Sequence, residues 1–150
     1  KEATILGNEQ WMWLEKTLKI KADVVILISS IQVLPTEHGY EKWSLFPNEM
    51  KRLIANIKNI NARTIIISGD RHKAAIYNDN NLFEVTSSSM NRPIKANVIM
   101  RADETDALMV GKVFNKENYG LLVIDSKLKT LQMSIKNIDG KVVSSVDLKL

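Results

Sequence analysis

Acidic, basic and imidazole side chains follow directly on a run of apolar residues in "TIIISGDRH", residues 64–72. Asp70 and His72 are two positions apart, and in an extended segment such residues project to the same side. A carboxylate and a neutral imidazole that converge in this way suit a cation of the iron, manganese or zinc type. Arg71 would then point away from that side, which favours an ion pair elsewhere over a contact with substrate.

Two further features bear on the function of this motif. One is the glycine that precedes Asp70, and the other is the position of the motif directly after an apolar run. Gly69 has no Cβ, so the backbone can turn sharply there and another group can approach closely. In open α/β sheets, ligands bind at the carboxyl ends of strands, which is where this motif would lie. An aspartate that caps a turn beside a surface histidine gives the same pattern. The residue types alone therefore leave a metal site and a capped turn as alternatives.

The elements that would position these residues follow from the hydrophobic pattern. Residues 7–18 have apolar residues at helical spacing, and a second helix is predicted from Pro47, which suits the first helical position. Residues 22–30 and 64–68 contain continuous Val/Ile runs of the kind found in buried strands. Residues 1–72 therefore predict helix, strand, helix, strand, as in a sheet covered by helices.

The C-terminal part has a different pattern. Residues 83–89 predict a strand, and Asp139-Gly140 is a two-residue turn signal with alternating apolar residues beyond it. Three further strand patterns follow one another at hairpin spacing: 107–114, 119–125 and 129–135. We expect an antiparallel sheet in the C-terminal third and a single domain. Within it, residues 1–90 form an α/β part that carries the Gly-Asp-Arg-His motif, and residues 91–150 add antiparallel strands.

Composition excludes several classes of function. The chain has 150 residues, 45% hydrophobic and 25% charged, which is typical of one folded domain. It has no cysteine, which excludes disulfides, thiolate metal sites and a cysteine nucleophile. Its net charge of +4 comes from scattered lysines, so we expect no nucleic-acid partner. The longest apolar run, Val24–Ile28, is far shorter than the roughly 20 residues of a membrane-spanning helix, so we expect no membrane span.

Six stretches of the chain have counterparts, in the same order, in one family of enzymes. They are "LGNEQWMWLEKTL", "ADVVILISSIQVLP", "EKWSLFPNEMKRLI", "ISGDRH", "EVTSSSMN" and the tail "NYGLLVID…IKNIDGKVV". By these stretches the chain resembles the PhoD-like alkaline phosphatase family, a branch of the calcineurin-like metallophosphoesterases, along nearly its full length. The stretch "ISGDRH" is similar to the last metal-binding motif of that family.

This resemblance implies a fold, an activity and a metal centre. The fold would be the calcineurin-like α/β sandwich, two sheets flanked by helices, of which this chain holds the C-terminal part. The activity would be the hydrolysis of phosphate monoesters or diesters, and the cofactor a binuclear or multinuclear centre of iron, calcium, manganese or zinc. Asp70 and His72 would be ligands of these metals. Family members are commonly secreted, periplasmic or attached to the cell surface.

The same resemblance implies that part of the site is missing. In the superfamily most other ligands come from Asp- and Asn-containing motifs on earlier strands, and this chain has no counterpart of them. The sequence begins with Lys1, and its first helix starts within ten residues. We therefore expect a piece of a longer protein, whose N-terminal half is its partner, and we expect the piece alone to lack full activity. The alternative is a non-catalytic binding or scaffold domain that keeps the fold.

Four further residues are candidates for contact with the substrate or with the metal ligands. Ser30 and Gln32 follow the strand predicted at 22–30, where the superfamily often places a site residue, but they would equally satisfy backbone groups at a strand end. Arg71 has a guanidinium that matches phosphate oxygens, although its predicted direction favours an ion pair. His38 would act as an acid or a ligand if its loop reached the site, and is otherwise expected to be an exposed loop histidine.

Overall fold

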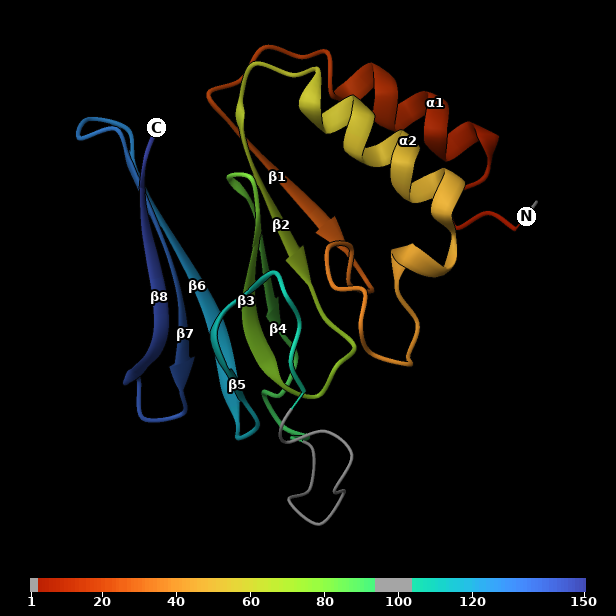
Figure 1. Cartoon of the computed structure of the whole chain (residues 1–150). Helices are drawn as coiled ribbons and strands as arrows, with labels where there is room; N and C mark the ends of the chain where they lie inside the picture. Colours follow the sequence, from red (N-terminus) through yellow and green to blue (C-terminus); the bar gives the residue numbers. More distant parts are fainter. Residues whose placement is uncertain (1–2, 94–103) are drawn as a thin grey trace.

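The structure, a computed structural model, describes residues 3–93 and 104–150 (Figure 1). It has two sheets and two helices in its described part. The elements in chain order are α1 (Asn8–Thr17), β1 (Val24–Ser29), a 3₁₀ turn (Trp43–Leu45), α2 (Pro47–Lys58), β2 (Arg63–Ser68), β3 (Ala74–Asp79), β4 (Leu82–Ser87), β5 (Met109–Phe114), β6 (Asn118–Asp125), β7 (Thr130–Asn137) and β8 (Val142–Lys149). Over these ranges no helix is long and apolar enough to cross a membrane.

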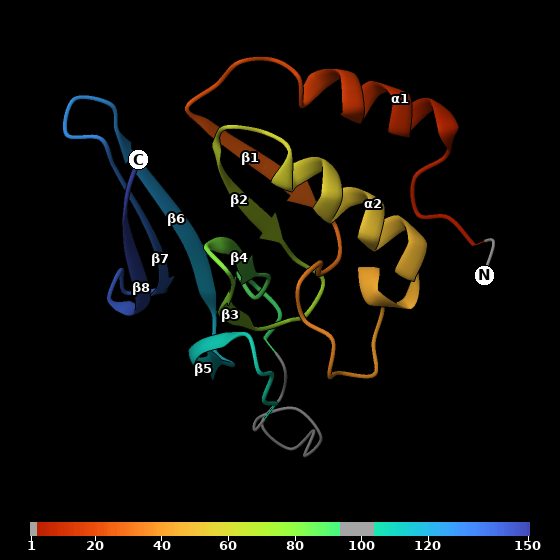
Figure 2. The same cartoon turned by 45° about the horizontal axis from the view of Figure 1, so that its top comes forward.

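The two helices form a layer on one face of the first sheet, and the second sheet lies on the other face (Figures 1 and 2). Both helices are confirmed, and α2 begins at Pro47 as predicted. They are joined by Trp11, whose indole N–H donates to Glu49 at 2.8 Å and whose ring lies 4.3 Å from the guanidinium of Arg52. Trp11 and Leu53 are buried in the core between the helices and the first sheet. The apolar faces of the helices therefore position this layer.

The first sheet has the strand order β1-β2-β4-β3-β5, in which β1, β2 and β4 are parallel. Strand β3, which the sequence did not reveal, forms a hairpin with β4 through Asn80 and Asn81, at φ 50° and 71°. Strand β5 pairs with β3 rather than with β6, so the expected place of 107–114 among the C-terminal hairpins is wrong. Ile76 and Tyr77, on opposite faces of β3, are both fully buried, and β5 pairs with the backbone N–H and C=O groups that such a buried strand would otherwise leave without partners.

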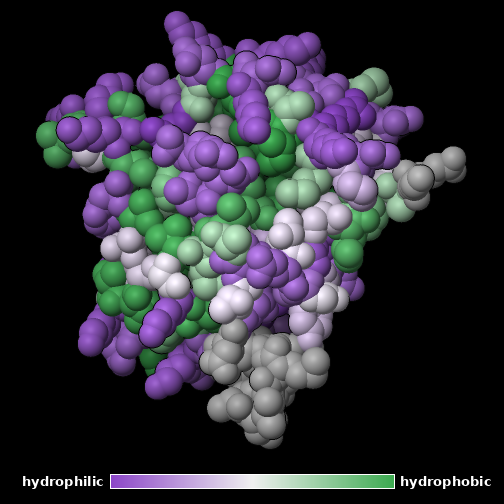
Figure 3. Space-filling view, in the orientation of Figure 1, coloured by the Kyte–Doolittle hydropathy of each residue, from purple (hydrophilic) through white to green (hydrophobic). Residues whose placement is uncertain are grey.

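The second sheet is the antiparallel C-terminal sheet that was predicted, with the order β6-β7-β8. Leu131, Met133 and Ile135 alternate along β7 and are fully buried in one cluster with residues of the first sheet. This cluster is the core between the two sheets. The other face of the second sheet is less buried, and Figure 3 shows hydrophobic side chains that reach the surface over it.

The parallel strands end together at one edge of the first sheet, and this edge positions the motif. In register, Ser29 of β1 lies beside Ser68 of β2, and Ser68 lies beside Thr86 of β4. The segments that follow these strands therefore leave the sheet next to one another. The motif Gly-Asp-Arg-His follows β2, in the middle of the three.

Candidate metal site

The motif forms a chain of bends between β2 and β3 and not the extended segment that the sequence suggested. Asp70 and His72 have φ angles of 61° and 53°, in the left-handed region that residues other than glycine seldom adopt. Burial nevertheless alternates along the motif. Asp70 and His72 are exposed, whereas Arg71 and Lys73 are buried. The two potential ligands are therefore on the exposed side of this segment, and Arg71 is on the buried side.

Gly69 does not make the turn that was expected of it. Its φ is not in the left-handed region, and a Cβ placed on it would lie 3.7 Å both from the carbonyl oxygen of Ser30 and from the Cβ of Ser88, which is ordinary contact. The sharp turns are made by Asp70 and His72 instead. These distances do show that Ser30 and Ser88 meet at Gly69, where the segments after β1, β2 and β4 come together.

A buried ion-pair network lies on the side of the motif opposite to the exposed Asp70 and His72. The Arg71 guanidinium lies 2.6 Å from the Glu104 carboxylate and 4.6 Å from the centre of the Tyr40 ring. The Lys73 ammonium lies 2.5 Å from the same carboxylate oxygen, and burial lowers the pKa of Lys73. The ion pair predicted for Arg71 is thus confirmed. Its guanidinium contacts Glu104 and Tyr40 on the buried side of the motif. It is therefore directed away from the exposed side, where Asp70 and His72 lie.

The backbone of the motif is fixed by one serine. Ser88 accepts a hydrogen bond from the Arg71 amide at 2.9 Å through its Oγ, and the same hydroxyl donates to the Lys73 carbonyl at 3.3 Å. The amide of Ser88 donates to that carbonyl as well. Hydrogen bonds on both sides of His72 therefore hold the motif against β4.

His38 belongs to this buried layer, so its expected place in an exposed loop is wrong. Its ring stacks on Tyr40, and its Nδ1 accepts a hydrogen bond from the Tyr40 amide at 3.1 Å. Burial, together with the positive charge of Arg71, lowers the pKa of His38 to about 4. The ring is therefore neutral at pH 7 and carries its proton on Nε2, which is buried without a hydrogen-bond partner in the described part of the chain.

The ring of His72 makes one hydrogen bond to the backbone. Its Nδ1–H donates to the carbonyl oxygen of Arg92 at 2.7 Å. A carbonyl only accepts, so this bond requires a proton on Nδ1, and the other ring nitrogen, Nε2, takes no part in it. Histidines that bind metals commonly have this arrangement, in which the second ring nitrogen donates to a carbonyl or carboxylate.

The remaining candidates divide between the surface and the interior. Ser30 is exposed beside Gly69. Gln32 is fully buried, and its amide donates to Thr86 at 2.8 Å, so it belongs to the layer beneath the strand ends.

Glu84, which the sequence analysis did not single out, organises that layer. Its fully buried carboxylate accepts hydrogen bonds from the amides of Val33 at 3.1 Å and Leu34 at 2.6 Å, and from Ser68 at 2.5 Å. Burial raises its pKa to about 6. Glu84 thereby ties the loop after β1 to the end of β2, directly before the motif. The signal for it was a single glutamate inside the apolar strand pattern "FEV".

Two donors are fewer than a metal centre needs. Asp70 offers carboxylate oxygens and His72 an imidazole nitrogen, a set that suits iron, manganese or zinc. Across residues 3–93 and 104–150, however, no group of three or more His, Cys, Asp or Glu side chains is placed to hold a metal ion. Within these limits the motif fits one side of a cation site.

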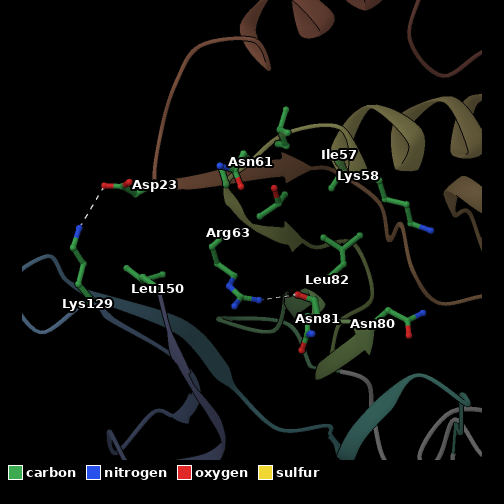
Figure 4. A pocket seen from close by; sticks show the side chains of 13 residues that line it. Asp23, Ile57, Lys58, Asn61, Arg63, Asn80, Asn81, Leu82, Lys129 and Leu150 are labelled. Carbon is green, nitrogen blue, oxygen red and sulfur yellow. Dashed lines mark hydrogen bonds and ion pairs between the residues drawn. The ribbon is translucent and has the colours of Figure 1, made fainter.

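A hollow of about 590 Å³ lies at the opposite edge of the first sheet, next to the starts of β1 and β2 (Figure 4). Three of the charged residues that line it already have partners. Arg63 donates to the Asn81 carbonyl at 3.4 Å, and Lys129 lies 3.6 Å from Asp23. The hollow is thus separate from the motif, which follows the carboxyl end of β2.

Comparison with known proteins supports the fold and no more. The sequence matches no family model, and no curated protein matches it. One similar solved structure is described as "GAP50 the anchor in the inner membrane complex of Plasmodium", with a TM-score of 0.75 and 14% identity over 95% of this chain and 42% of that chain. Another is described as "Structure of PhoD", with a TM-score of 0.71 and 16% identity over 99% of this chain and 33% of that chain. The chain thus shares its α/β fold with these two structures and spans less than half the length of either.

Proposed function

We propose that this chain supplies part of the metal site of a phosphoesterase, with Asp70 and His72 as ligands and a phosphate monoester or diester as substrate. The observation that carries the proposal is the hydrogen bond from His72 Nδ1 to the Arg92 carbonyl, because it leaves Nε2 free as a donor on the exposed side of the motif. The position of the motif after a parallel strand supports a ligand site. The likeness in fold to PhoD supports the class of reaction.

Residues 70–73 then have separate roles. Asp70 and His72 would hold an iron, calcium, manganese or zinc ion of a binuclear or multinuclear centre. Such ions polarise a phosphate ester and lower the pKa of a nearby water. Arg71 and Lys73 are paired with Glu104 on the buried side, which supports a role in positioning the two ligands rather than in contact with substrate. The remaining ligands would come from polypeptide ahead of Lys1, so the chain alone would lack full activity.

A second candidate is a non-catalytic anchor or scaffold domain. It is favoured by the fold neighbour whose description calls it an anchor, and by the presence of only two potential donors at the motif in the described ranges. In that case Asp70 and His72 would be solvated surface residues. The two candidates therefore differ in whether these residues hold metal.

Metal analysis and hydrolysis assays on the longest polypeptide that its gene encodes separate the two. We expect the purified protein to contain transition metal or calcium and to hydrolyse p-nitrophenyl phosphate or its bis ester. Asp70→Ala and His72→Ala should each reduce both metal content and turnover, with turnover lower by at least about tenfold, as expected for the loss of a ligand. Residues 1–150 alone should show no more than a small fraction of that turnover.

Glu41→Ala is the matched control, since it removes an exposed carboxylate of the neighbouring loop. It should leave metal content and turnover unchanged, and thermal unfolding should show that all three variants are folded. Full metal content and turnover in Asp70→Ala would contradict the phosphoesterase proposal. A longer protein that holds no metal and hydrolyses neither ester would favour the anchor.

A further inference from the structure

The free edge of the first sheet, at β1, is apolar and exposed. Strand β1 pairs with β2 on one side, and no described strand pairs with it on the other. Ile26 and Ile28 are 41% and 79% exposed. A mostly apolar hollow of about 370 Å³ lies between β1 and α1, where Trp13 is also exposed. Soluble proteins seldom leave an apolar strand edge uncovered, because its free N–H and C=O groups pair with other strands.

The exposed side chains of β1 belong to the core between the two sheets. Ile26 lies in register with Ile65 of β2, whose fully buried side chain is part of that core. Adjacent strands put residues in register on the same face, so Ile26 and Ile28 face the side of the second sheet. Strand β6 contacts β4, whereas β8 contacts β3 and β5, so β6 is the rim strand nearer to β1. Ile124 on the inner face of β6 is 43% exposed, and the core therefore opens on this side.

The connections of the first sheet indicate what covers this edge. Helix α2 connects the parallel strands β1 and β2, and α1 lies beside it on the same face of the sheet (Figure 2). Connections of this kind between parallel strands are right-handed in about 98% of cases. Two such connections on one face must step across the sheet in the same direction. A strand before α1 would consequently lie on the side of β1 away from β2, which is the free edge.

The start of the described chain lies where such a strand would end. Ile5 and Leu6 line the same hollow as Ile28 and Ser29, at the carboxyl end of β1. Glu49 accepts hydrogen bonds from the amides of Ile5 at 3.1 Å and Leu6 at 3.0 Å, which fixes this entrance to α1. A strand that runs parallel to β1 would have its carboxyl end next to the carboxyl end of β1, close to Ile5 and Leu6. The polypeptide can therefore pass from it directly into α1.

We propose that a strand ahead of Lys1, in a longer polypeptide, pairs in parallel with β1 and contributes side chains that cover Ile26 and Ile28. The two structures of similar fold extend well beyond the part that this chain matches, which leaves length for such a strand. The inference shares with the proposed function only the premise of a longer polypeptide. It would stand if Asp70 and His72 bound no metal.

The same substitution in two forms of the protein tests the added strand. Ile28→Glu should lower the thermal midpoint of the longest encoded polypeptide by more than about 5 °C, because it buries a charge at the new pairing. In residues 1–150 alone it should shift the midpoint by less than about 2 °C, since Ile28 is already exposed there. Ile138→Glu is the control, because Ile138 is 68% exposed at the turn between β7 and β8. This substitution should leave the thermal midpoint of both forms unchanged.

Hydrogen exchange gives a second readout that does not depend on metal or activity. The amides of β1 that do not bond to β2 should exchange at least about a hundredfold more slowly in the longer polypeptide than in residues 1–150. A reading frame that starts at or next to Lys1 would overturn the proposal, as would equal exchange in the two forms. A dimer of residues 1–150 that Ile28→Glu dissociates, together with a silent Ile28→Glu in the longer form, would assign the edge to a second copy instead.

Discussion

His38→Asn tests the claim that the layer beneath the motif is built around a neutral ring. In the folded protein His38 is buried beside Tyr40, and the charged groups that face it are Arg71, Lys42, Lys73 and Glu104. Burial and Arg71 lower its pKa from 6.5 to about 4. Asparagine does not titrate, and its side-chain oxygen can accept the Tyr40 amide in place of Nδ1. The substitution therefore removes the titration and keeps the hydrogen bond.

The sign and size of the effect follow from linkage. The folded protein binds a proton at His38 less tightly than the unfolded chain does, so acid favours unfolding. The stabilisation by the neutral ring is complete above pH 6.5 and is lost as the pH falls to about 4. A shift of this size corresponds to about 3 kcal/mol in the free energy of unfolding. Loss of ring packing in the variant adds a cost that does not change with pH.

Urea unfolding followed by tryptophan fluorescence at pH 7.5, 6, 5 and 4 measures the effect. The wild type should exceed His38→Asn in unfolding free energy at pH 7.5, and this difference should fall by about 3 kcal/mol by pH 4. The subtraction cancels groups that titrate alike in both proteins, Glu84 among them. A difference that is the same at all four pH values would refute the assignment of a buried, neutral His38.

Two further variants test neighbouring parts of the same structure. Burial raises the pKa of Glu84 to about 6, so the wild type should gain about 2 kcal/mol in unfolding free energy relative to Glu84→Gln as the pH falls from 7 to 4.5; equal pH responses of the two proteins in urea unfolding would contradict this. At Asp70, where φ is 61°, metal-free Asp70→Gly should be more stable than Asp70→Ala by about 1 kcal/mol. Glycine is ordinarily the less stable of the two, so a calorimetric difference of the opposite sign would argue against the left-handed backbone.

The helices and the buried parallel strands could be predicted from the sequence because their signals are local. The continuous Val/Ile runs marked β1 and β2, and Pro47 marked the first turn of α2. Strand β3 was missed because its six residues lie between two polar segments. The pair Asn80-Asn81 was a usable signal, since asparagine tolerates the positive φ of a tight hairpin turn.

The place of β5 could not be predicted in the same way. The spacing between 107–114 and 119–125 suits a hairpin, and no residue pattern in either segment indicates pairing with a different strand. Pairing of β5 with β3 follows from the position of β3 inside the sheet, which joins segments about 35 residues apart. Local pattern thus sets the type of an element, and long-range burial sets its neighbour.

The site shows the same division. That Asp70 and His72 follow a strand, and that Arg71 forms an ion pair, could be predicted from the motif itself. The partner Glu104 lies 33 residues further along the chain, and no local signal connects the two. The burial of His38 likewise arises only in the folded structure, where its ring stacks on Tyr40 and Arg71 is near enough to lower its pKa.

The backbone conformation and the buried charges of the motif have a cost in stability, and this cost bears on our proposal of a ligand site. The left-handed backbone at Asp70 and at His72 costs about 1–2 kcal/mol each, and the charges of Arg71, Lys73 and Glu104 must be stripped of water to be buried. Apolar residues and a relaxed turn would serve stability as well or better. A scaffold that needs only the fold gains nothing from these features. Strained backbone and buried charges are often found at functional sites, so these features support our proposal that Asp70 and His72 bind metal.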